Sequence, residues 1–465
     1  MRKEKILVLV AVLLSSVSLP ITLTGASVAL PDIATDLDAQ LAPVQWVVNG
    51  YNTTFASFML ASGSLADLVG RRRVYAAGVA VFAVTGLLGT LVTDIVLLDV
   101  VRAVAGAGAA AVAASGGALL ATSFHGPSRT RVFGLLGTVL GVGLAFGPTV
   151  AGALVGTFGW RMVFGLPAAV ALTTLALVPL LPESRDPAPR RVDIGGAVTF
   201  TLFLLLLITG FVEGPDLGWT SPLPLTAFGA SLVCLAVFAG IERRRPDPMF
   251  DLELFTGPRF LAFSTAAATI VCVLVPLLVY LPSYFTEVLG MSPQRAGATL
   301  IMLTAPTLVL PSLTGLVTRW VSPAAVVVLS TVLVGAGAAW LALAGPRTGA
   351  SGLAGPLLTI GLGVGASIGL IDGVAIGSAP ADRAGTAAGM LNTARLGSET
   401  IAIAVCGAVL AATTGGRLAG PGFTEGLRVT LWAMAGLSLL SVLLCVLLLR
   451  GGPTVRRAAR KGVSV

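Results

Sequence analysis

Four ionisable side chains lie inside long apolar stretches of this sequence. Arg102, Asp372, Arg395 and Glu399 are each surrounded by apolar residues. A charged side chain at the centre of a bilayer costs about 2.5–3.5 kcal/mol on insertion scales, so such residues face the protein interior. Desolvation also disfavours the charged form of a carboxyl group, which lets it bind and release a proton near neutral pH. These four residues are therefore candidates for proton coupling.

Their spacing suggests how they are related. Arg395 and Glu399 are four residues apart, so on a helix they share one face; they could also be a structural ion pair. Counted from the ends of their apolar stretches, Asp372 and Arg395 differ in depth by about 6 Å, which an arginine side chain can bridge. Asp99, three residues before Arg102, could simply neutralise it near the surface. We expect Glu399 or Asp372 to carry the proton, with Glu399 favoured because it shares a face with Arg395.

The elements that position these residues are membrane-spanning helices. The chain of 465 residues is 55% hydrophobic and 11% charged, with a mean hydropathy of +0.95, whereas soluble domains are about 25% charged. Apolar runs of about 20 residues mark spanning helices. An all-α polytopic membrane protein is predicted, with fourteen such helices at roughly 6–30, 44–66, 74–93, 97–121, 132–156, 161–181, 194–213, 222–241, 260–283, 295–317, 323–344, 353–378, 386–411 and 427–449.

Charge distribution predicts the topology. With the N-terminus inside, 22 of the 29 basic residues fall in cytoplasmic segments, so the positive-inside rule places both termini in the cytoplasm. Two charged, proline-bearing loops separate the seventh and eighth helices from two groups of six. The predicted units are an N-terminal six-helix bundle, a central pair with its loops, a C-terminal six-helix bundle and a basic tail, at 1–182, 183–258, 259–450 and 451–465.

The sequence lacks the residues that several classes of function require. His125 is the only histidine, so no histidine-based metal site is expected. No Gly-x-x-x-x-Gly-Lys loop for ATP occurs, so a gradient must drive any transport, and no cofactor is expected. The net charge of +8 indicates topology rather than nucleic-acid binding. A polytopic membrane enzyme is a weaker alternative, because no cluster of His, Asp or Glu lies in a sizeable loop.

Glycine recurs at four-residue spacing in the fifth apolar run. Gly143, Gly147 and Gly152, with Pro148, form the pattern G-x-x-x-G-P-x-x-x-G. In lipid, small residues four apart let helices approach closely, and a proline bends a helix. The pattern is at least a helix-packing face.

The loop between the second and third apolar runs combines glycines with opposite charges. It reads GSLADLVGRRR, from Gly63 through Asp67, Gly70 and Arg71 to Arg73. A basic turn that satisfies the positive-inside rule explains the arginines alone. The full pattern, with one aspartate beside the arginines, is more specific.

Together these two patterns resemble the signature sequences of the fourteen-helix drug:proton antiporters of the major facilitator superfamily. The resemblance implies two six-helix bundles related as parallel repeats, with two added helices between them. It implies that Asp67 and Arg71 latch the bundles together on the cytoplasmic side, and that Arg102 takes part in proton coupling. Two residues depart from the family pattern: Ala105 replaces the usual glutamine, and Ala151 replaces a glycine.

The first helix departs more strongly. The family usually has an aspartate there, and Thr22 stands at that position. Thr22, Thr24 and Ser27 are therefore candidates for lining a substrate cavity or, equally, for helix packing. Asn392 lies in a segment resembling the family's thirteenth helix and is a further cavity candidate.

The sequence thus predicts a proton-coupled exporter of lipophilic drugs or antibiotics in the cell membrane. Its expected partners are the bilayer, protons and a small lipophilic substrate, with no nucleic acid and a monomeric state. The transport alternatives are an exporter dedicated to one endogenous metabolite and an uncoupled facilitator.

Overall fold

The computed structural model describes residues 2–125, 127–185, 193–245, 250, 252–345, 348–379, 384–415 and 420–451, and within them the secondary structure is entirely helical. The N-terminal helices are α1 (Arg2–Asp36), α2 (Leu41–Val69), α3 (Arg71–Leu91), α4 (Ile95–Ser123), α5 (Pro127–Phe158) and α6 (Met162–Leu177), followed by the short η1 (Val178–Leu180). A central pair follows, α7 (Ile194–Leu217) and α8 (Pro222–Arg244).

The C-terminal helices begin after the short η2 (Leu252–Thr256). They are α9 (Pro258–Glu287), α10 (Pro293–Thr304), α11 (Pro306–Val317), α12 (Pro323–Ala342), α13 (Ala350–Ser367), α14 (Leu370–Gly377), α15 (Ala384–Thr414) and α16 (Pro421–Gly451). Proline stands in the first turn of α8 to α12, where its missing N–H has no helical partner to lose.

Twelve helices of the described chain are long and apolar enough to cross a membrane. The twelve do not include the predicted spans 44–66 and 295–317. Two predicted runs are interrupted, and the second of them, 353–378, still counts among the twelve as one span. The run 295–317 is divided into α10 and α11 at Ala305, just before a proline. The run 353–378 is divided into α13 and α14 at Gly369, whose φ of +77° suits glycine.

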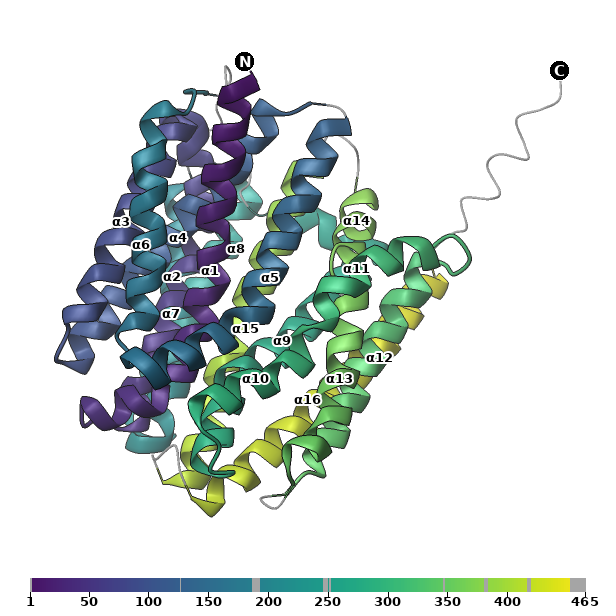
Figure 1. Cartoon of the computed structure of the whole chain (residues 1–465). Coiled ribbons are helices and arrows are strands. Elements are labelled where there is room, and N and C mark those ends of the chain that lie inside the picture. Colours follow the sequence, from purple (N-terminus) through teal and green to yellow (C-terminus); the bar gives the residue numbers. More distant parts are fainter. Residues whose placement is uncertain are drawn as a thin grey trace.

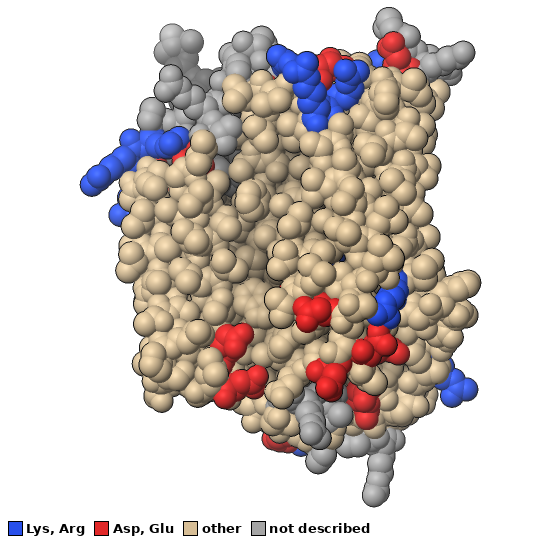
Figure 2. All heavy atoms as spheres, turned by 90° about the vertical axis from the view of Figure 1, so that its left-hand side faces the viewer, with Lys and Arg blue, Asp and Glu red and all other residues tan. Residues whose placement is uncertain are grey.

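The helices stand side by side between two ends of unlike charge (Figure 1). Arg71, Arg72 and Arg73 mark one end, which we call the basic end, and Asp36 and Asp94 mark the other, the acidic end. Figure 2 shows most of the acidic side chains of one face gathered toward its lower end and a group of basic side chains at its upper end, with a largely uncharged band between them. Such a band matches the hydrocarbon core of a bilayer.

The N- and C-terminal helices meet along α5 with α10 and along α2 with α15. Helix α7 packs against both α2 and α15, so it covers this second contact from the side. Its apolar residues Phe200, Leu204 and Ile208 share one core with Ala56 of α2 and Ala404 of α15. The central pair is therefore packed against both groups.

Candidate functional site

Arg102 lies deep among the N-terminal helices, with 3% of its surface exposed. Its Nε donates to the carbonyl of Val47 at 2.9 Å, and its guanidinium lies 4.3 Å from the ring centroid of Tyr51 and 5.4 Å from that of Phe164. Among the ion pairs of the described residues, none joins Arg102 to Asp99. The arginine is thus held by a carbonyl and aromatic faces, which stabilise a desolvated cation. Asp99 interacts with Arg102 electrostatically without a direct ion pair, so its neutralising role stays a prediction.

The polar residues of α1 fall into two kinds. Thr22 is 3% exposed and lines a small cavity together with Arg102. Thr24 and Ser27 instead donate to carbonyls one turn earlier in α1, at 2.8 and 3.1 Å. The cavity beside Thr22 has a volume of only about 10 Å³ and lies within the N-terminal helices, so a role of Thr22 in a substrate cavity stays a prediction. The hydroxyls of Thr24 and Ser27 are used within their own helix. Asn392 of α15 is exposed.

Asp372, Arg395 and Glu399 come together where α14 meets α15. Arg395 Nη2 lies 2.6 Å from Asp372 Oδ1, so the arginine bridges the two helices as the depth argument predicted. Glu399 is 8% exposed, makes no ion pair or hydrogen bond within the described chain, and interacts electrostatically with Arg395. The structure therefore pairs Arg395 with Asp372 and leaves Glu399 as the buried carboxyl.

The α2–α3 loop is built around an internal ion pair. Asp67 Oδ1 accepts from Arg71 Nε at 2.9 Å and from Nη2 at 2.7 Å, and Gly70, at φ +125°, makes the turn. The backbone N–H of Arg71 donates to the carbonyl of Ser184 at 2.9 Å. The loop is thus tied to the N-terminal helices.

The glycines of α5 are contact points for two different helices. A methyl group at Gly143 would lie 2.6 Å from Pro20 Cγ of α1, and one at Gly147 would clash with Thr24 of the same helix. Further along, a methyl group at Gly152 would clash with the carbonyl of Pro293 in α10. Along α5, Gly143 and Gly147 therefore contact a helix of the same group, whereas Gly152, nearer the acidic end, contacts a helix of the other group.

The contact between α5 and α10 closes the acidic end. Thr149 Oγ1 donates to the carbonyl of Gly297 at 3.1 Å, and the carbonyl of Pro148 lies where a methyl group on Gly297 would clash. Nearer the basic end of the same helix a methyl group on Gly137 would have no neighbour within 4 Å, and Leu135 and Leu140 are 42% and 38% exposed. The close contact of α5 with α10 therefore lies toward the acidic end.

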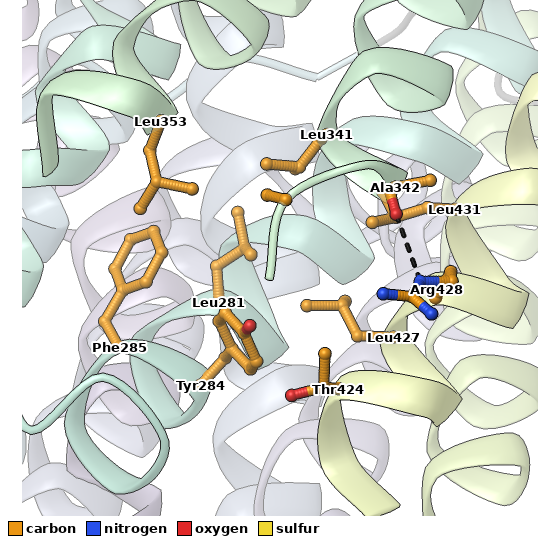
Figure 3. Close-up of a pocket in the computed structure, with 11 residues that line it drawn as sticks. Leu281, Tyr284, Phe285, Leu341, Ala342, Leu353, Thr424, Leu427, Arg428 and Leu431 are labelled. Atoms are coloured by element: carbon orange, nitrogen blue, oxygen red, sulfur yellow. Dashed lines mark hydrogen bonds between the residues drawn. The ribbon is translucent and has the colours of Figure 1, made fainter. Parts of the chain in front are cut away.

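A cavity within the C-terminal helices lies apart from this site. It is enclosed by α9, α12, α13 and α16, and Arg428 at its edge donates to the carbonyl of Ala342 at 3.3 Å (Figure 3). Its cavity volume is about 10 Å³, far below the roughly 300–1,000 Å³ of pockets that enclose a drug-sized ligand. We assign it to packing.

Sequence reasoning missed a polar face on α2. Gln45, Asn49 and Asn52 are all buried, and Gln45 lies against Gly407 of α15. Their i, i+4, i+7 spacing inside an apolar helix was the available signal.

The chain is similar to known proteins in both sequence and fold. Residues 12–403 match the sequence description of the Major Facilitator Superfamily. The chain belongs to the major facilitator superfamily. The fold agrees: a nucleoside transporter (NupG) superimposes with a TM-score of 0.65 at 15% identity, covering 96% of this chain and 99% of the other. A peptide transporter (POT) superimposes with a TM-score of 0.69 at 14% identity, covering 95% of each chain.

Relatives within the superfamily carry names of resistance and export. A multidrug resistance protein (Stp) of Mycobacterium tuberculosis is 30% identical over 89% of this chain and 77% of its own length. The cephamycin export protein CmcT of Amycolatopsis lactamdurans is 33% identical over 84% and 82%. The tetracenomycin C resistance and export protein of Streptomyces glaucescens is 29% identical over 88% and 76%. The chain is thus a multi-pass efflux-type membrane transporter rather than an enzyme.

Proposed function

We propose that this transporter exports lipophilic drugs or antibiotics across the cell membrane in exchange for protons. The observation that carries the proposal is the buried Glu399 beside the Arg395–Asp372 pair, in a molecule whose α5 and α10 are in close contact toward the acidic end. A carboxyl group of this kind can bind a proton in one state and release it in the other. Arg395 could then exchange partners between Asp372 and the ionised Glu399, which links protonation to helix movement.

The proposal includes a fourteen-helix topology. Helix α2 has 29 residues and α10 with α11 covers 293–317, so both are long enough to cross a bilayer. Two six-helix bundles with α7 and α8 between them then form the units 1–182, 183–258, 259–450 and a tail, with both termini cytoplasmic and the basic end inside. We propose that the protein acts as a monomer.

Drug susceptibility and vesicle transport test this function. A host lacking its own pumps, expressing the chain, is expected to become resistant to a set of lipophilic antibiotics. Export in vesicles is expected to collapse when the proton gradient is dissipated. The names of the cephamycin and tetracenomycin C relatives favour a second candidate, export of one endogenous compound, for which resistance would extend to a single compound class.

Orientation gives a direct prediction. In a cysteine-free background, Arg185→Cys is expected to react with an impermeant thiol reagent only from the cytoplasm, and Trp219→Cys only from outside. The reason is the concentration of arginine at the basic end. Labelling of intact cells and inverted vesicles measures this, and the opposite pattern would reverse the orientation.

The loop ion pair gives a second prediction. Asp67→Asn is expected to lower transport by about tenfold, the effect of 1.4 kcal/mol on a rate, without reducing the amount of protein in the membrane. In this state Asp67 holds Arg71, and we propose that both groups bridge the bundles when the basic end closes. The matched control is Glu183→Gln, because Glu183 contacts Arg72 and Arg73 instead, at 3.7 Å. Equal transport by the two variants would show that the loop only sets the membrane topology.

A further inference from the structure

The polar face on α2 consists of three carboxamide side chains, Gln45, Asn49 and Asn52, which we call the amide stripe. Their exposed fractions are 2%, 0% and 1%. In the described part of the chain, neither the nitrogen nor the oxygen of any of these amides has a hydrogen-bond partner. Buried polar groups are nearly always hydrogen-bonded in native proteins, so this stripe is an exception with an energetic cost.

The stripe faces α15 across the boundary between the N- and C-terminal helices. A methyl group on Gly407 of α15 would lie 2.6 Å from Gln45 Oε1 and would clash with the hydroxyl of Tyr280 from α9. Helix α2 begins at the acidic end and α15 ends there, so the two helices run antiparallel, and the i, i+4, i+7 spacing places Asn49 and Asn52 on the same face of α2 as Gln45.

This contact lies in the closed half of the molecule. Gln45 is in the first turns of α2, at the acidic end, where α5 and α10 also meet. Glycine at position 407 lets α15 approach close enough for the amides to be fully covered. Closure therefore buries the stripe, and separation of α2 from α15 would return its amides to water.

We propose that the amide stripe and Gly407 form a gate at the acidic end whose closed state is destabilised by its own buried amides. Leaving a buried donor or acceptor unpaired costs more than a made hydrogen bond contributes. The gate opens readily because water satisfies the amides in the open state. Gly407 sets how closely the gate shuts. This inference concerns the transport cycle and does not depend on which ion is exchanged.

The test is labelling of a buried cysteine in a nanodisc, where reagent reaches both faces. The reporter is Ala411→Cys in a background lacking Cys234, Cys272, Cys406 and Cys445. Ala411 is 4% exposed and lies one turn beyond Gly407 toward the acidic end. A small methanethiosulfonate reagent labels it in proportion to the fraction of time that the gate is open.

Two substitutions are expected to move labelling in opposite directions. Gly407→Ala prevents α15 from packing fully against α2 and raises the labelling rate by about tenfold or more, because the rate is proportional to the fraction of molecules with an open gate. Asn49→Leu with Asn52→Leu replaces unpaired amides with apolar groups of similar size, lowers the labelling rate by a similar factor and raises the melting temperature.

Matched controls lie on the same two helices. In Gly397→Ala the added methyl group makes only ordinary van der Waals contact, 3.8 Å from Phe200. In Thr53→Val the hydroxyl that is removed donates a hydrogen bond to the carbonyl of Asn49 within α2, at 2.6 Å. Both should label like the parent. If Gly407→Ala labels no faster than Gly397→Ala, or if the leucine pair labels as fast as Thr53→Val, the gate is wrong. Should the leucine pair not fold, Asn49→Leu alone carries the same prediction.

Discussion

Glu399→Gln is expected to abolish proton-driven export while leaving substrate exchange across the membrane intact. Glutamine keeps the size and polarity of the side chain and removes its titratable proton. Glu399 is buried and makes no ion pair in the described structure, and the amide is a permanent mimic of the protonated carboxyl group. Accumulation of an identified substrate against a pH gradient should fall by at least about tenfold, or 1.4 kcal/mol.

Asp372→Asn is the informative comparison. It breaks the 2.6 Å pair with Arg395 without removing the buried carboxyl, so coupling should weaken but persist. Proton flux accompanying substrate, measured with a pH-sensitive dye inside vesicles, separates the two variants. If both variants and the double variant exchange protons at the original stoichiometry, neither residue carries the proton.

The sequence predicted the helices well because a bilayer imposes one length on every span. It predicted the interruptions less well. Hydropathy is continuous through Ala305 and Gly369, so nothing in a window average reveals that the backbone breaks there. The signals were local: a proline at 306 removes a helical donor, and a glycine at 369 permits positive φ.

For the charged residues, the sequence could predict only those contacts that follow from the position of each residue along its own helix. The Arg395–Asp372 bridge was predicted from depth, a one-dimensional quantity that hydropathy supplies. The preference of Arg395 for Asp372 over Glu399 required knowing how α14 packs on α15. The contacts of Arg102 with Val47 and Tyr51 could be predicted only by knowing how α2 packs on α4. Such contacts between helices are not encoded in the period of either helix alone.

The amide stripe shows a different limit. The three polar residues lie in a helix of 29 residues that is not among the twelve most apolar spans. Their spacing marks one face, but only the structure shows that this face meets Gly407 at a boundary between helix groups. The α5 glycines were easier, because four-residue spacing itself predicts close contact, although it could not assign each glycine to its partner helix.

That assignment leads to the final prediction: Gly152→Val is expected to lower transport by at least about tenfold while the protein still folds. The added side chain collides with the carbonyl of Pro293, a contact between α5 and α10 that forms only when the acidic end closes. Overpacking by a few carbon atoms costs about 1–3 kcal/mol, which here falls on one state of the cycle. Vesicle transport and the melting temperature of the purified protein measure the two effects.

Two other glycines of α5 serve as controls. Gly143→Val meets Pro20 and Val17 of α1, a contact internal to the N-terminal helices, so it should lower the melting temperature and the yield of folded protein. Gly137→Val has nothing within 4 Å and should change neither quantity. If Gly152→Val instead behaves like Gly143→Val, losing stability before transport, then the α5–α10 contact is a permanent part of the fold and does not open during the cycle.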